Sequence, residues 1–235
     1  ETVASIGLET DGVLTRQWLE DYSSLRPEMP FAEVDIFALR DEIEQAGQVR
    51  HAEVERIFPD KLRVALREHK PVLRLAVPDA DGRPDVLLVA RSGVIYRGQS
   101  YSAARLESLP FLAGVRPRRQ DGVFQPLPSL DAVVDLLATA RRDYGQLYQD
   151  WRVVSCAQYD ARDGFPGSVI EVRTRNGIRL IFGDDAFPAQ LARLEKILVR
   201  ASSQGIGPIE RIDLSLESPV LAVAESRRHG PPSRM

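Results

Sequence analysis

Residues 52–73, AEVERIFPDKLRVALREHKPVL, constrain the fold most strongly, because two alternating runs flank a turn-like FPDK. The second run places apolar residues at every other position and basic residues between them. The apolar set is Leu62, Val64 and Leu66, and the basic set is Lys61, Arg63 and Arg67. Period-two alternation is typical of a half-buried antiparallel strand, and a proline followed by an aspartate favours a turn. The segment is therefore predicted to be a β-hairpin with one buried face.

The basic side of this hairpin raises the question of an anionic ligand. Acidic residues lie beside the basic ones across the two runs, namely Glu53, Glu55 and Glu68. Opposite charges that face each other across strands stabilise a sheet modestly. The whole chain carries a net charge of −3, whereas nucleic-acid binding usually needs a basic domain or stripe. We therefore interpret the face as solvated, and we expect neither nucleic acid nor a small-molecule substrate as a ligand.

The first 75 residues supply a complete small core. A short apolar strand over Val3–Leu8 precedes a helix over Arg16–Leu25, for which Thr15 is the predicted N-cap. Asp35 begins a second helix that Gly47 ends, and the hairpin follows. Two helices on one face of a three-stranded sheet form a closed core, so the order predicts an α+β fold of βααββ type.

The remaining sequence predicts a larger, mixed antiparallel β domain with flanking helices. Strands are expected over 72–77, 86–90, 94–98 and 151–160, and helices over 130–147 and 186–205, with Ser129 as an N-cap. Asn176-Gly177 between two alternating runs indicates a tight hairpin with positive φ at both turn residues. One or two strands follow over 209–225. The predicted domains are 1–75, 76–226 and a disordered tail, 227–235.

Residues that often carry chemistry give weak signals here. The histidines show no metal-ligand spacing, and the single cysteine, Cys156, lies inside an apolar run where a buried thiol is the usual case. Asp184-Asp185 before a helix fits favourable interaction with the helix dipole, and Asp160 and Asp163 fit solvated turn positions. Phosphate-binding and hydrolase motifs are absent from the sequence. We expect no catalytic residue, no metal and no cofactor.

The hairpin segment also resembles a known signature. VRHAEVERIFPDKLRVALREHKPV is similar to the POTRA domain of the FtsQ/DivIB cell-division family, which runs V-x-x-A-x-V-x-R, a Phe-Pro turn, L-x-V-x-L and E-x-x-P-V. Later segments resemble the same family in the same order, namely LLVARSGVIYRG, LPFLAG and ERIDLSLESPVLAV. The resemblance implies a non-catalytic scaffold with a POTRA domain and a β domain on the periplasmic side of the inner membrane. It also implies a single membrane-spanning segment upstream of Glu1.

In that family the last strands and the preceding helix of the β domain bind the FtsB–FtsL pair by strand addition, in which main-chain hydrogen bonds supply affinity. The resemblance therefore implies FtsB/FtsL-like partners, and further division proteins besides. The partner-binding residues it implies are Arg211, Asp213, Ser215, Leu216, Glu217, Ser218, Val220, Ala222, Val223, Leu191, Leu194 and Lys196. The sequence departs from the family pattern at Ser215, where an arginine is usual, and at Leu216 and Ala224, where aromatic residues are usual.

Two other classes of function remain open from the sequence. A POTRA domain also serves in polypeptide secretion or outer-membrane assembly, where a transmembrane β-barrel normally follows it. An extracytoplasmic enzyme with an unrecognised site is the other class, for which a cleft at Asp184, Asp185 or Cys156 would be needed.

Overall fold

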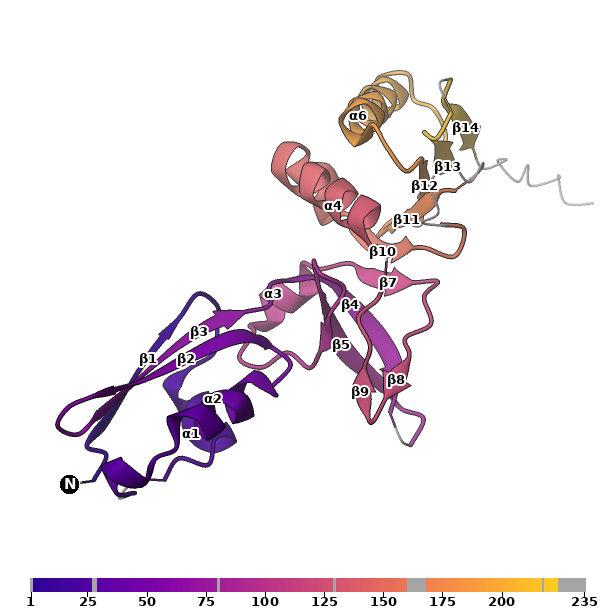
Figure 1. Cartoon of the computed structure of the whole chain (residues 1–235). Coiled ribbons are helices and arrows are strands. Elements are labelled where there is room, and N and C mark those ends of the chain that lie inside the picture. The colour runs from indigo at the N-terminus through magenta and orange to yellow at the C-terminus, as the bar shows by residue number, and fades with distance from the viewer. Residues whose placement is uncertain are drawn as a thin grey trace, which may run out of the picture. The chain divides into compact units, whose positions relative to one another are not determined.

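The computed structural model describes residues 2–26, 29–79, 81–128, 130–159, 168–216 and 218–223. The predictions for Ser129, Asp160, Asp163, Glu217 and residues 227–235 lie outside these ranges. The chain divides into two compact units, one of Glu1–Leu109 with Arg116–Leu130 and one of Pro110–Val115 with Asp131–Met235. The predicted α+β class is confirmed, since an N-terminal helix-and-sheet domain is followed by a larger β-sheet domain (Figure 1).

The N-terminal domain has the predicted order of elements. They are β1 (Ser5–Thr10), α1 (Arg16–Tyr22), the short 3-10 helix η1 (Phe31–Glu33), α2 (Ile36–Glu44), β2 (Val49–Ile57) and β3 (Lys61–Glu68). The strand order is β1-β3-β2, with β1 parallel and β2 antiparallel to β3. Both helices lie on one face of this sheet (Figure 1).

Local sequence signals account for the two helices. Thr15 accepts a hydrogen bond from the backbone N–H of Trp18 through its hydroxyl, and Asp35 accepts from Phe37 and Ala38 through its carboxylate. These side chains satisfy N–H groups that have no partner inside the helix. The predicted N-cap at Thr15 is therefore confirmed, as is the start of the second helix at Asp35.

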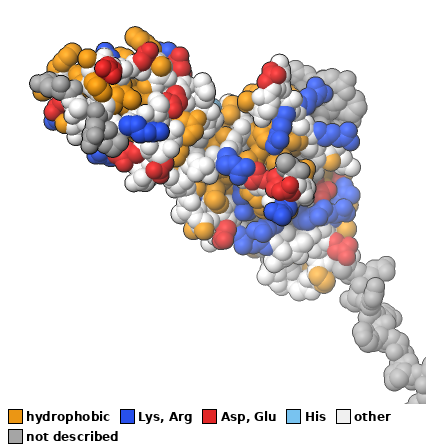
Figure 2. All heavy atoms as spheres, turned by 90° about the horizontal axis from the view of Figure 1, so that it is seen from below, with side chains coloured by type: hydrophobic (Ala, Val, Ile, Leu, Met, Phe, Trp, Pro, Cys, Tyr) orange, Lys and Arg blue, Asp and Glu red, His pale blue; other side chains and the backbone are white. Residues whose placement is uncertain are grey.

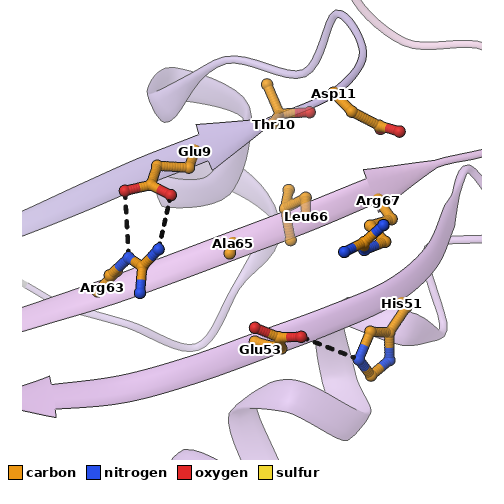
Figure 3. A pocket seen from close by; sticks show the side chains of 9 residues that line it. All are labelled: Glu9, Thr10, Asp11, His51, Glu53, Arg63, Ala65, Leu66 and Arg67. Carbon is orange, nitrogen blue, oxygen red and sulfur yellow. Dashed lines mark hydrogen bonds and ion pairs between the residues drawn. The ribbon is translucent and has the colours of Figure 1, made fainter.

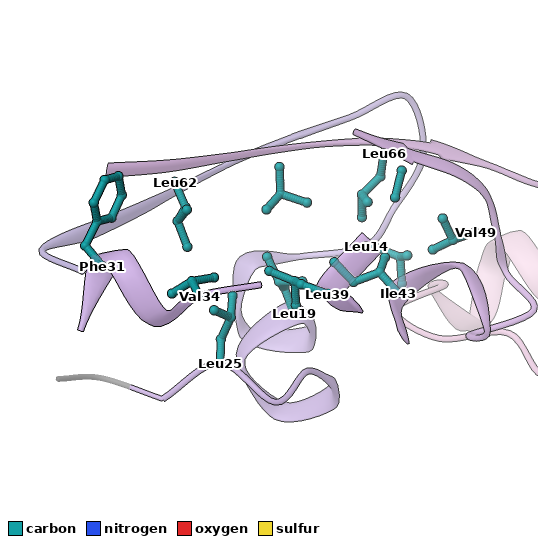
Figure 4. Close-up of a cluster of buried hydrophobic side chains, with 12 residues drawn as sticks. Leu14, Leu19, Leu25, Phe31, Val34, Leu39, Ile43, Val49, Leu62 and Leu66 are labelled. Atoms are coloured by element: carbon teal, nitrogen blue, oxygen red, sulfur yellow. The ribbon is translucent and has the colours of Figure 1, made fainter. Parts of the chain in front are cut away.

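The core of the N-terminal domain lies between the helices and the sheet. In Figure 4 the side chains of Leu62 and Leu66 point from the sheet toward Leu19 and Ile43 on the helices. Leu19 and Ile43 have no exposed surface. Burial of side chains of this size contributes about 1.5–3 kcal/mol each, which holds the helices on the sheet.

Glu68 is a correction to the sequence interpretation, because it does not lie on the solvated face. It shares the parity of Leu62, Val64 and Leu66, and it is 4% exposed. Its carboxylate accepts hydrogen bonds from the Thr10 hydroxyl, the Leu14 backbone N–H and the Gln48 amide. A buried carboxylate is tolerated where hydrogen bonds replace its hydration. Because Glu68 follows Leu66 by two residues, the alternation of the sequence alone would have placed it on the buried face.

The rest of the first unit is built on a β meander, a short helix and a small hairpin. The elements are β4 (Pro71–Pro78), β5 (Pro84–Ala90), β6 (Ile95–Tyr96), α3 (Ala103–Glu107), β8 (Arg119–Gln120) and β9 (Val123–Phe124). β5 pairs antiparallel with both β4 and β6. The turn into β6 requires a glycine at position 93, where φ is +80° and an added Cβ would lie 2.2 Å from the Leu127 carbonyl oxygen.

The second unit is a twisted sheet with helices. Its elements are β7 (Phe111–Ala113), α4 (Asp131–Asp143), α5 (Gly145–Gln149), β10 (Trp151–Ser155), β11 (Ile170–Thr174), β12 (Arg179–Phe182), α6 (Phe187–Ser203), β13 (Ile209–Asp213) and β14 (Val220–Val223). The strand order in this unit is β14-β13-β12-β11-β10-β7. Trp151 packs between Tyr148 and Phe182, with ring centroids 5.8 and 5.7 Å apart respectively.

The predicted hairpin at Asn176-Gly177 is confirmed, but its turn differs from the prediction. Gly177 has φ of +84°, whereas Asn176 does not have positive φ. The Gly177 N–H donates to the Thr174 carbonyl, and the Thr174 N–H donates to the Ile178 carbonyl. This is the pattern of a three-residue hairpin loop with glycine in the left-handed position, one residue longer than the two-residue turn that was predicted.

The surface carries both signs of charge. Basic and acidic side chains lie close to one another on the face drawn in Figure 2. Within the described ranges, no helix combines the length and the apolar character needed to cross a bilayer.

Candidate partner-binding edge

β14 is the outermost strand of the second unit in the part of the chain that the structure describes. It pairs antiparallel with β13 from Ile209↔Val223 to Asp213↔Val220, with an irregularity between Ile209 and Arg211. An antiparallel strand paired on one side directs half of its N–H and C=O groups away from that partner. β14 therefore presents main-chain groups on its outer side, and its four residues, VLAV, carry no charge.

Apolar side chains gather at this edge. Val220 is 55% exposed, Val223 is 39% exposed, and Leu216 in the preceding loop is 51% exposed. Natural edge strands are usually protected by charged residues, proline or a covering segment. Within its four residues, β14 has neither a charge nor a proline, which is the chemistry expected of a strand that pairs with another chain.

Asp213 fixes the exit of β13. Its carboxylate accepts hydrogen bonds from the Ser215 N–H at 3.2 Å and the Ser215 hydroxyl at 2.6 Å, and Arg211 binds it at 2.7 Å. Burial is the largest single influence and would raise the pKa of Asp213, but the hydrogen bonds from Ser215 and Arg211 together lower it. Ser215, where the family usually has arginine, thus has a structural role in turning the chain toward β14.

Arg193 on α6 holds the same loop from the other side. Its guanidinium donates to the carbonyl oxygens of Leu214 and Leu216, each at 3.1 Å. Hydrogen bonds from a charged donor contribute more than neutral ones, about 1.5–3 kcal/mol each. The loop that leads into β14 is therefore tied to α6 by backbone contacts, so that α6 and the edge strand form one surface.

The start of α6 is fixed by a buried amide. Gln190 accepts from the Gly183 N–H at 3.0 Å and donates to the Asp185 carbonyl at 2.6 Å. It is 3% exposed. Asp184 and Asp185 therefore belong to the turn between β12 and α6 that Gln190 holds.

The residues implied by the family resemblance fall into two groups. Leu191 and Leu194 are completely buried, so their side chains face the core of the second unit and do not lie on the surface of α6. The exposed members are Lys196, Leu216, Ser218, Val220, Ala222 and Val223, and Arg211, Asp213 and Ser215 are partly exposed. The structure thus brings the C-terminal members together on β13, β14 and their connecting loop.

Val199 is a candidate that the sequence reasoning missed. It is 66% exposed on α6, one turn beyond Glu195 and Lys196. In an amphipathic helix an apolar residue on the polar face stands out once the buried stripe of Leu191 and Leu194 has been assigned. The helical spacing was sufficient to find it.

In the N-terminal sheet, β2 is an edge strand whose outer side is partly occupied. The Glu44 carboxylate accepts from the Ala52 backbone N–H at 2.9 Å, and the same oxygen lies 3.0 Å from His51 Nδ1. A hollow of about 280 Å³ lies beside this strand and includes Phe37. Because Glu44 already satisfies an outward N–H, added pairing at β2 would have to displace it.

A shallow hollow of about 400 Å³ lies on the solvated face of the N-terminal sheet. Figure 3 shows Arg63 from β3 pointing to Glu9 on β1 and His51 pointing to Glu53 on β2. Arg63 also binds Glu55 at 3.1 Å. The hydrogen bonds that Arg63 donates to Glu9 and Glu55 raise the pKa of Arg63, and the bond to Glu9 lowers the pKa of Glu9. The pairs that Arg63 forms with Glu9 and Glu55 connect neighbouring strands, and they support cross-strand stabilisation rather than a phosphate cradle.

Two further observations bear on catalysis. Burial raises the pKa of the Cys156 thiol to about 11, which leaves little of the reactive thiolate near neutrality. Among the described residues, histidine, cysteine and carboxylate side chains form no group of three that could hold a metal ion.

The class of the N-terminal domain follows from its topology and from a family match. Residues 2–69 match the family model described as POTRA domain, FtsQ-type. The βααββ unit is therefore a POTRA domain. The FtsQ-type match supports an FtsQ/DivIB-type protein, and it covers the N-terminal domain. None of the curated proteins matches the chain.

Proposed function

We propose that this chain is the extracytoplasmic part of a non-catalytic scaffold of bacterial cell division. The FtsQ-type POTRA domain suggests such a divisome-related role. On this proposal the chain is anchored in the inner membrane by a single span on its N-terminal side and lies in the periplasm. The proposed domains are the POTRA domain over 1–75, the β domain over 76–226 and a tail over 227–235.

We further propose that FtsB/FtsL-like division proteins bind at β14 by adding a strand to the sheet. The observation that carries this proposal is the uncharged outer edge of β14, which combines main-chain groups with exposed Val220 and Val223. Main-chain hydrogen bonds would give affinity, and alternate side chains would give specificity. β2 is the weaker candidate for strand addition, because Glu44 already binds the N–H of Ala52.

The role proposed for each site residue follows from its exposure. Val220, Ala222, Val223, Leu216 and Ser218 would contact the added strand or its flanks. Lys196 and Val199 would contact a partner helix lying on α6. Leu191 and Leu194 would act from the core by holding α6 in place.

The test measures affinity between the purified chain and the periplasmic segments of FtsB- and FtsL-like proteins from the same genome. Val220→Lys places a charge on the proposed edge, and Val123→Lys is the matched control, because Val123 is 67% exposed on β9 in the first unit. We expect Val220→Lys to weaken binding on the order of tenfold or more, from the loss of one apolar contact. Equal affinity of the two variants would remove β14 from the interface.

A second measurement separates strand addition from a surface patch. Partner peptides carry N-methyl groups on either of the two alternate sets of backbone nitrogens. In strand addition one set faces β14 and the other faces away, so one methylated peptide loses binding and the other keeps it. Equal binding of both peptides would show that main-chain pairing is not used, and no binding of the unmethylated segments would contradict the proposed function as a whole.

A further inference from the structure

The tip of the β2–β3 hairpin exposes large apolar side chains. Phe58 is 80% exposed and Ile57 is 45% exposed. Phe58 contacts the buried Phe31 edge-on, with ring centroids 5.5 Å apart, and this contact leaves most of its ring in solvent. A phenylalanine held so far out of a folded domain gains free energy when an apolar phase covers it.

The same tip lies beside the point where the N-terminal strand enters the domain. The Ala4 N–H donates to the Asp60 carbonyl at 2.9 Å, and β1 begins opposite the start of β3, with Ser5 paired to Lys61. Parallel pairing of β1 with β3 forces this arrangement, since both strands start at one end of the sheet. Any segment that precedes residue 2 is therefore joined to the domain next to Phe58.

The side chains around the tip suit a bilayer interface. Lys61 is exposed beside Ile57 and Phe58, whereas the Arg56 guanidinium donates to the Val34 carbonyl oxygen. Long basic side chains keep their charge in water or at headgroups while their stems lie along apolar material. Glu55 is also exposed at this end of the hairpin, so the tip carries charges of both signs. The exposed apolar side chains of Ile57 and Phe58 therefore indicate the kind of partner better than the charges do.

We propose that Ile57 and Phe58 insert into the headgroup region of the membrane to which the domain is anchored. This inference rests on the proposed membrane anchorage. A single aromatic side chain binds a bilayer weakly by itself, but an adjacent anchor raises its effective concentration at the surface. The contact gives the POTRA domain a second attachment beside the first and so fixes its tilt on the membrane.

The experiment uses the full chain with an N-terminal histidine tag, held on zwitterionic phospholipid vesicles that contain nickel-chelating lipid. Phe58→Trp places a fluorophore at the tip, and Val123→Trp places one at the exposed control position in the same unit. Trp18 and Trp151 are present in every sample, so each variant is compared with the unsubstituted chain. Brominated lipids then quench tryptophan that reaches the bilayer.

We expect the added emission of Phe58→Trp to shift to the blue and to be quenched, while that of Val123→Trp is not. Adding Ile57→Asp to Phe58→Trp should reduce the quenched fraction on the order of tenfold, by placing a charge beside the inserted ring. Equal quenching of the two tryptophan variants, or none, overturns the proposal. A blue shift of Phe58→Trp that rises with protein concentration without vesicles also overturns it, because a second copy would then cover the tip. Partner binding at β14 is measured in solution, so a failure here is distinct from a failure of the proposed function.

Discussion

Glu68→Gln is the substitution for which the structure predicts the sharpest energetic effect. The carboxylate accepts three hydrogen bonds, from the Thr10 hydroxyl at 2.5 Å, the Leu14 N–H at 2.9 Å and the Gln48 amide at 2.8 Å. A glutamine has the same shape but offers one acceptor oxygen and one donor group. The new amide group must therefore face at least one of these donors.

The Gln48 amide does not relieve this conflict by rotating. Its oxygen accepts from the Gln99 N–H at 2.7 Å, and its NH₂ group also faces the Gln99 carbonyl at 3.3 Å. An unsatisfied buried donor costs about 1–3 kcal/mol, and the remaining bonds lose the strength that an ionised acceptor gives. We expect Glu68→Gln to destabilise the N-terminal domain by about 2–4 kcal/mol, which is a large share of a typical domain's stability.

Hydrogen exchange measured by mass spectrometry on β2 and β3 resolves this domain from the second unit. Glu55→Gln is the matched control, because Glu55 is a carboxylate on the same hairpin whose side chain is 57% exposed and binds Arg63. Exposed ion pairs contribute little, so this control should change protection by about 0.5 kcal/mol or less. If Glu68→Gln changes protection no more than the control does, the assignment of Glu68 as a buried, fully hydrogen-bonded carboxylate is wrong.

Three further predictions concern the second unit and the pH dependence. Arg193→Met should free the loop that leads into β14, raise hydrogen exchange in that loop on the order of tenfold and weaken partner binding. Lys196→Met, at an exposed position on the same helix, should leave exchange in the loop unchanged. Alkylation of Cys156 by iodoacetamide at about pH 8 should be slow in the folded chain and fast in urea, because burial raises the pKa of the thiol to about 11; fast alkylation of the folded chain would contradict its burial. Burial, with a smaller effect from Arg50, lowers the pKa of His69 below its ordinary 6.5, so the folded state favours the neutral ring. Stability should therefore fall as the pH drops from about 7 to about 5, and His69→Asn should flatten that slope in urea unfolding; an unchanged slope would assign it to other groups.

If the proposed function holds, the two units have separate roles, since one carries the POTRA domain and the other carries the exposed strand edge. The edge strand would bind the partner, and the hairpin tip would contact the membrane. Arg193, Asp213 and Ser215 matter to this division because they set the path of the chain into β14 without lying on its outer edge. Substitutions at these positions are expected to act through the loop rather than through direct contact.

The sequence by itself determined the elements whose signals are local. Thr15 and Asp35 mark the starts of α1 and α2 because a capping side chain acts within three residues of its own position. The alternation around FPDK determined the β2–β3 hairpin, because side chains on a strand repeat every two residues. The sequence also contained the buried position of Glu68, but its charge led us to group it with the solvated residues. It contained the exposed position of Val199 as well, but the leucine stripe of α6 drew attention away from it.

Only the tertiary structure decided which edge of the sheet is free and what covers each residue. β13 pairs with β12 in parallel and with β14 antiparallel, and strand order depends on long-range packing that no local pattern encodes. The same packing buries the α6 side chains of Leu191 and Leu194 while it leaves Val220 in solvent. It also brings Gln48, Glu68 and Gln99 from distant parts of the chain into one hydrogen-bond network. A buried carboxylate needs hydrogen-bond donors, and the fold determines which donors lie near it.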